Sequence, residues 1–199
     1  MEITFVWVLS QIFTVVEYGL LGATYLAKNR KLIVTLDIAS MACGIVAYIL
    51  LGADVGMAMS VIILLANFYY LWDENKHSAK ERAKLHTRDY VVLAMVLLGI
   101  GVVTALTWEG WVGLLSVAAT VLYEISIWQK STKVYKFLGI PVAFCWMTYN
   151  GFVWSPFGVL CEMVMFITSI IGYAREVKAG KRVKNSARKK RCVRSGGAR

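Results

Sequence analysis

The chain has 199 residues, of which 58% are hydrophobic and 17% are charged, and its mean hydropathy is +0.61. Soluble domains carry about 25% charged residues, so this composition excludes an ordinary soluble enzyme. The net charge of +10 could indicate nucleic-acid binding, but the basic residues are confined to short segments between apolar runs. We therefore expect a membrane protein without a nucleic-acid partner.

Seven apolar runs follow one another along the chain, each about 18 to 24 residues long, the length with which an α-helix crosses a bilayer. They cover residues 4–26, 32–52, 55–72, 90–107, 111–128, 134–153 and 157–174. The first run has no basic segment before it and no clear cleavage site after it, so we expect a permanent helix rather than a signal peptide. The sequence thus predicts an all-α membrane protein with seven transmembrane helices.

The basic residues indicate how these helices are oriented. In an arrangement of seven spans, all 22 Lys and Arg residues fall on one side, and the opposite side carries only Glu2, Asp54 and Glu109. The positive-inside rule then places the amino terminus outside and the carboxyl terminus in the cytoplasm. One span more or fewer would scatter the basic residues over both sides, which supports the count of seven.

The polar segments outside the runs contain no recognisable catalytic or metal site. His77 and His86 are nine residues apart in the loop 74–89 and have no partner cysteines, so no metal site is expected there. Motifs for nucleotide binding, zinc proteases and serine hydrolases are absent, so we expect neither enzymatic activity nor a cofactor. The basic tail 176–199 has no apolar periodicity and is expected to be disordered and to contact anionic lipid.

An internal repeat becomes visible when the chain is shifted by 102 residues. Lys28 then aligns with Lys130 and Cys43 with Cys145, and a basic loop, a span, a tight turn and a second span recur at matching positions. Because both copies carry the basic loop on the same side, the two three-helix units are expected to be parallel, and the fourth run restores the orientation between them. Carriers of the SWEET type have this 3+1+3 arrangement, with a substrate site near the midplane between the repeats.

This arrangement divides the chain into five parts. They are a first three-helix unit at 1–73, a loop at 74–89, a linker helix at 90–107, a second three-helix unit at 108–175 and the tail at 176–199.

Several short motifs resemble the YgjV family of bacterial inner-membrane proteins over most of residues 5–175. They are the KNRK loop at Lys28–Lys31, the turn at Leu50–Gly56, Asn67 in the third span, the W-x-x-Y-N motif at Trp146–Asn150 and the stop at Gly172–Arg175. The resemblance implies a multi-pass protein of the bacterial inner membrane. A more distant similarity to SWEET and PnuC carriers implies facilitated passage of a sugar, nucleoside or vitamin precursor. The Pro-Gln signature of the eukaryotic relatives is absent.

Polar residues inside spans are costly and usually face a bundle interior or a wet cavity. Asn67 in the third run and Ser169 in the seventh occupy matching repeat positions, and the similarity to SWEET carriers implies that Asn67 contacts the substrate. The alternative for both residues is interhelical hydrogen bonding. Glu162 and Glu17 lie deep in their spans and are expected to bind a proton or a cation, with structural pairing as the alternative.

Other residues in the spans are expected to be either site residues or structural. Trp146 and Asn150 combine a flat ring with an amide, which suits a solute with a ring. Tyr70 and Trp72 end the third span and are expected to be interfacial anchors. Two acidic residues nearer the basic side are expected to form local ion pairs, Asp37 with Arg30 and Glu124 with Lys130.

The leading hypothesis is a carrier for a small polar solute that works by rocking of the two units around a midplane pocket. The pocket is expected to be lined by Asn67, Trp146, Asn150, Glu162 and Ser169, with Glu17 as a secondary candidate. Membrane lipids, the solute and further copies of the chain are its candidate partners. The alternative is a non-transporting membrane scaffold or partner-binding protein with a solidly packed interior. An intramembrane enzyme using Glu162 with Asp37 is weaker still, because the two residues lie at opposite depths.

Overall fold

The computed structural model describes residues 5–52, 54–77, 84–108, 110–152 and 156–196. These ranges form α-helices and contain no strand, so the all-α class is confirmed. The helices are α1 (Phe5–Leu26), α2 (Arg30–Leu51), α3 (Asp54–Lys76), α4 (Thr87–Leu106), α5 (Gly113–Trp128), α6 (Thr132–Phe152) and α7 (Pro156–Gly196). The acidic residues Glu2 and Glu109 lie outside the described ranges.

Five of the described helices, α1, α2, α3, α4 and α7, are long and apolar enough to cross a membrane. Helix α5 is shorter, with 16 residues, and α6 has 21 residues but includes Lys133, Lys136 and Asn150. Length and composition therefore establish a multi-pass membrane protein.

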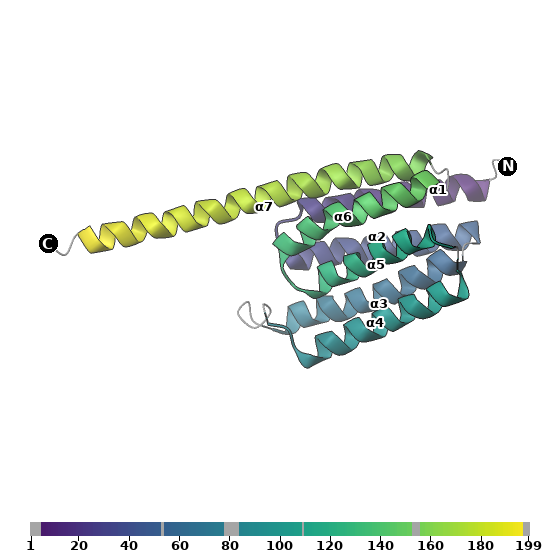
Figure 1. The fold of residues 1–199 in the computed structure, drawn as a ribbon, viewed down its shortest axis with the longest axis horizontal. Coiled ribbons are helices and arrows are strands. Elements are labelled where there is room, and N and C mark those ends of the chain that lie inside the picture. Colours follow the sequence, from purple (N-terminus) through teal and green to yellow (C-terminus); the bar gives the residue numbers. More distant parts are fainter. Residues whose placement is uncertain (1–4, 53, 78–83, 109, 153–155, 197–199) are drawn as a thin grey trace.

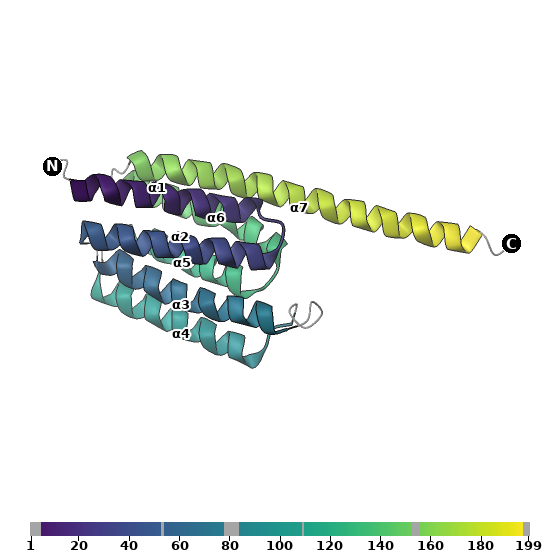
Figure 2. The same ribbon diagram turned by 180° about the vertical axis from the view of Figure 1, so that it is seen from behind.

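The helices form a closed ring in chain order. Each helix packs against the next one along the chain, and α7 packs against α1. Figure 1 shows α5 and α6 in front of α2 and α1, and Figure 2 shows α1, α2 and α3 in front when the molecule is turned around. Odd-numbered helices run in one direction and even-numbered helices in the other. We call the end where α1, α3 and α5 finish the basic end, because the Lys and Arg residues of the connections gather there.

Local sequence explains where α2 begins and ends. Asn29 is the N-cap, and its Oδ1 accepts a hydrogen bond of 2.8 Å from the backbone N–H of Leu32. Gly52 ends the helix with φ of 66°, a left-handed conformation that glycine adopts without steric cost, and its N–H bonds to the carbonyls of Tyr48 and Ile49. The KNRK and LLG motifs are therefore the two ends of this helix.

Small residues allow α1, α6 and α7 to approach closely near the basic end. Tyr25 is only 2% exposed and stacks on Tyr135 with 5.2 Å between ring centroids. A Cβ atom at Gly139 would overlap the Tyr25 ring, and one at Gly172 would overlap the Tyr25 carbonyl oxygen. The Gly172 position thus fixes the distance between α1 and α7 where the ring closes.

Helix α7 continues far beyond the other helices at the basic end (Figures 1 and 2). It has 41 residues and ends at Gly196, so the prediction of a disordered tail was wrong. The tail is rich in Lys and Arg, which have high helix propensity, and it contains no proline to break the helix. Absence of apolar periodicity therefore did not mean absence of helix.

Candidate functional site

The main cavity lies inside the helix ring, in the half away from the basic end. Its volume is about 530 Å³, within the range of small-molecule sites, and all seven helices contribute to its lining. Trp108, in the connection between α4 and α5, lines the cavity and is 57% exposed. The cavity therefore reaches the surface at the end opposite the basic end.

Two carboxylates from neighbouring helices form an acidic wall of this cavity. Glu17 of α1 and Glu162 of α7 both line it, and the Tyr18 hydroxyl donates a hydrogen bond of 3.3 Å to Oε1 of Glu162. The Glu17 carboxylate lies over Gly44 of α2, where a Cβ atom would come within 2.5 Å of Oε1. Among the described residues, no basic side chain pairs with either carboxylate.

Aromatic rings form much of the remaining lining. The Trp146 and Tyr149 rings of α6 meet edge to face with 5.7 Å between centroids. The Tyr48 ring of α2 packs against Gly56 of α3, because a Cβ atom there would come within 2.7 Å of the ring. These rings give the cavity flat apolar walls beside its two carboxylates.

A buried polar cluster forms the floor of the cavity. The Asp37 carboxylate is fully buried and accepts hydrogen bonds from the Tyr123 hydroxyl and from the Asn67 side-chain amide. This cluster joins α2, α3 and α5. The predicted pair of Asp37 with Arg30 is wrong, because Arg30 Nε instead lies 2.8 Å from Glu74 Oε1 on α3.

The sequence-predicted site residues separate into three groups, those that line the cavity, one in its floor and two outside the lining. Glu17, Trp146 and Glu162 line the cavity, whereas Asn67 lies in its floor. Ser169 is fully buried outside the lining, where its hydroxyl donates to the Phe166 carbonyl at 2.8 Å. Asn150 is half-buried on α6 and is also outside the lining.

Sequence reasoning missed Tyr18, Tyr48 and Tyr123 as site residues. Each is a tyrosine within an apolar run, a polar group at a depth where hydrocarbon is expected. The position of a tyrosine within an apolar run could therefore have identified all three residues from the sequence. The prediction of Tyr70 as an interfacial anchor was also wrong, because Tyr70 is 1% exposed, whereas Trp72 is 46% exposed.

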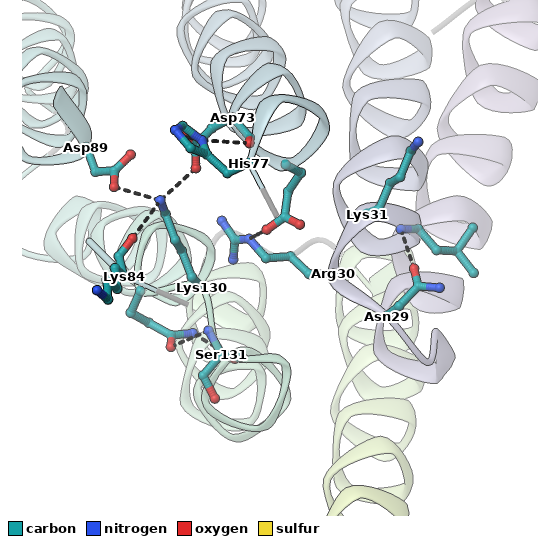
Figure 3. Close-up of polar contacts among 12 residues, drawn as sticks. Asn29, Arg30, Lys31, Asp73, His77, Lys84, Asp89, Lys130 and Ser131 are labelled. Carbon is teal, nitrogen blue, oxygen red and sulfur yellow. Dashed lines mark hydrogen bonds and ion pairs between the residues drawn. The ribbon is translucent and has the colours of Figure 1, made fainter. Parts of the chain in front are cut away.

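Buried ion pairs close the basic end of the ring. Lys130, in the connection between α5 and α6, points between Asp73 of α3 and Asp89 of α4, as Figure 3 shows. Its Nζ lies 2.7 Å from an oxygen of each carboxylate and 3.2 Å from the carbonyl of Lys84. The predicted pair of Lys130 with Glu124 is therefore wrong. Both carboxylate oxygens of Glu124 are buried without a hydrogen-bond partner among the described residues.

A second lysine ties together the helices on the other side of the ring. Lys136 of α6 donates from Nζ to the Ala27 carbonyl at 2.7 Å and to Glu176 Oε2 on α7 at 2.9 Å. Together with the contacts of Arg30 and Lys130, this joins helices α2, α3, α4, α6 and α7 and the connections that follow α1 and α5 at the basic end. The bundle is thus closed by charged contacts at one end and hollow toward the other.

The two histidines lie near this closure. The His77 and His86 rings stack with 5.1 Å between centroids, and Nδ1 of His77 lies 3.0 Å from Asp73 Oδ1. Within the described part of the chain, no group of three or more His, Cys, Asp or Glu side chains is arranged to hold a metal ion.

Comparison with known proteins identifies the family. A family model for a bacterial inner membrane protein, Imp-YgjV, matches residues 8–179. This region includes the cavity lining and the closure at the basic end. Neither a curated protein nor a solved structure matches the chain. The chain belongs to the Imp-YgjV family of bacterial inner membrane proteins.

Proposed function

We propose that this protein is a carrier that moves a small polar solute across the bacterial inner membrane by alternating access. The observation that carries the proposal is the cavity of about 530 Å³, which is lined by all seven helices and reaches the surface at the end opposite the basic end. A scaffold without transport activity needs no such cavity, since its interior would be filled by side chains.

The directions of the helices support two parallel three-helix repeats within seven membrane crossings, because the corresponding helices of α1–α3 and α5–α7 run the same way. In the first set, α2 contacts both α1 and α3, and in the second set α6 contacts both α5 and α7. Helix α4 contacts α3 and α5 and lies at the edge of the bundle, as a linker would (Figure 1). Rocking of parallel repeats about a site between them is a known means of alternating access.

The proposed orientation places the basic end in the cytoplasm. The described Lys and Arg residues gather at that end, and the positive-inside rule assigns it to the cytoplasmic face. The basic extension of α7 would then lie near anionic lipids of the inner leaflet. In this orientation the cavity opens to the outside, so the structure corresponds to an outward-open state.

The transport cycle then requires the charged closure to open. Lys130 must leave Asp73 and Asp89, and Arg30 must leave Glu74, before the floor can admit solute to the cytoplasm. Closure of the outer end around the bound solute would supply the opposing motion. The buried ion pairs therefore act as the inner gate of the proposed carrier.

A cavity-blocking variant tests whether the cavity is the pathway. Ser116 of α5 lines the cavity, whereas Leu114 on the same helix is 40% exposed and outside the lining. Ser116→Trp should abolish uptake into proteoliposomes, and Leu114→Trp should leave it unchanged. The assay uses a panel of labelled sugars, nucleosides and amines. Failure of every solute to enter with the wild-type protein, or equal uptake by both variants, would refute the proposal.

A further inference from the structure

The cavity contains two carboxyl groups that no basic side chain among the described residues balances. Its lining includes Glu17 and Glu162 but no Lys, Arg or His. The described Lys and Arg residues lie toward the other end of the ring, where three of them, Arg30, Lys130 and Lys136, pair with Asp73, Glu74, Asp89 and Glu176. The charges of the bundle are therefore separated along its axis, with the carboxylates of the cavity left without a cation.

These two carboxylates are placed where an unbalanced charge is costly. Glu162 is 6% exposed, and its side-chain partner among the described residues is the neutral hydroxyl of Tyr18. The Glu17 carboxylate has no hydrogen-bond or ion-pair partner among the described side chains and is confined over Gly44. A buried carboxylate is stabilised by a cation that comes close enough to pair with it. A cationic solute would supply that charge when it enters the cavity.

The aromatic lining favours an organic cation over a bare metal ion. Tyrosine and tryptophan faces attract ammonium groups, and aromatic cages of this kind bind quaternary ammonium ligands. Tyr48 lines the same cavity as Glu17 and Glu162. Trp146 and Tyr149 add two further rings from α6. Carboxylates and rings thus line the same cavity.

We infer that the cavity binds a small organic cation, a protonated amine or a quaternary ammonium compound, with its charge at Glu17 and Glu162 and its apolar groups against Tyr48 and Trp146. The inference rests on the proposed function only for the passage of this cation across the membrane. It narrows the solute from any polar molecule to one with positive charge. A neutral sugar would leave both carboxylates without a counter-charge.

Binding of choline and of its uncharged isostere to the purified full-length protein tests the inference. Dimethylbutanol has the shape of choline, with carbon in place of the charged nitrogen. Choline should raise the thermal unfolding midpoint and quench tryptophan fluorescence, and dimethylbutanol should do neither at the same concentration. Equal binding of the two compounds, or binding of neither, would overturn the inference. This comparison uses the wild-type protein and so does not depend on a variant that folds.

Charge-removing variants locate the binding site. Glu17→Gln and Glu162→Gln keep the side-chain shape, and each should weaken choline binding about ten-fold or more, since each removes one charged partner. Glu176→Gln is the matched control on α7, because Glu176 is outside the cavity and pairs with Lys136. Unchanged choline affinity in a folded Glu17→Gln, Glu162→Gln double variant would overturn the assignment.

Uptake into proteoliposomes separates failure of this inference from failure of the proposed function. Entry of choline into the proteoliposomes supports both the cation site and the carrier function. Entry of neutral solutes while choline is excluded would leave the carrier intact and overturn the cation inference. Choline binding without entry of choline or any other solute would support the cation site and refute the carrier.

Discussion

Replacement of Lys130 by Met should destabilise the protein strongly. The Lys130 side chain is 2% exposed, and its Nζ lies 2.7 Å from both Asp73 and Asp89, whose side chains are 4% and 0% exposed. Removal of one member of a buried ion pair costs about 3 to 5 kcal/mol, because the remaining charge is left without a counter-charge. Asp89 would keep hydrogen bonds from the Tyr69 hydroxyl and the His86 N–H, so we expect the lower end of this range.

Thermal unfolding in detergent, followed by tryptophan fluorescence, measures this loss. For a chain of this size, about 3 kcal/mol corresponds to a fall in unfolding midpoint of about 6 to 12 °C. The control is Lys133→Met, because Lys133 lies three residues away, is exposed and has no ion pair among the described residues. Addition of Asp73→Asn and Asp89→Asn to Lys130→Met should restore much of the stability, since no buried charge then remains uncompensated. A Lys130→Met protein as stable as the Lys133→Met protein would refute the role given to these charges.

Three other substitutions test packing and polar contacts by the same measurement. Gly172→Ala should lower the free energy of unfolding by about 1 to 3 kcal/mol, because the new Cβ would overlap a carbonyl oxygen of α1. The control is Gly180→Ala on the same helix, where the new Cβ meets nothing within 4 Å and the effect should be neutral or stabilising. If the two behave alike, α1 and α7 do not pack as described. Tyr123→Phe should cost about 1 to 3 kcal/mol, because buried Asp37 loses a hydrogen-bond donor. Its neighbour Glu124 has no such partner among the described residues, so Glu124→Gln should stabilise the protein by about 1 kcal/mol; a marked loss would show that its carboxylate is paired.

The sequence predicted the helices well because the information needed is local. Apolar runs of membrane-crossing length, Asn29 as a cap and Gly52 as a left-handed terminator each depend on neighbouring residues. The depth of Glu17 and Glu162 was also readable, because a charge in the middle of an apolar run must face the interior. The α7 extension was misjudged because charged residues with high helix propensity can form a helix without an apolar face.

The partners of buried charges could not be read from the sequence in the same way. Arg30 and Asp37 are seven residues apart, a spacing that suggested a local pair. In the folded ring, Asp37 meets Tyr123, which is 86 positions away, and Lys130 meets Asp73, which is 57 positions away. Such contacts depend on how seven helices are rotated about their axes. That rotation is set by the packing of all of them together, for which a single sequence gives no direct signal.

The ring order has a consequence for how the protein is made. Because every helix packs against its predecessor, the bundle can grow one helix at a time as the ribosome delivers them to the membrane. The last contact, between α7 and α1, has to wait until the whole chain has been translated. Until then the face of α1 that carries Tyr18, Gly22 and Tyr25 lacks its neighbour α7 and is open to lipid, so we expect a nascent chain halted before Pro156 to be a target for membrane proteases.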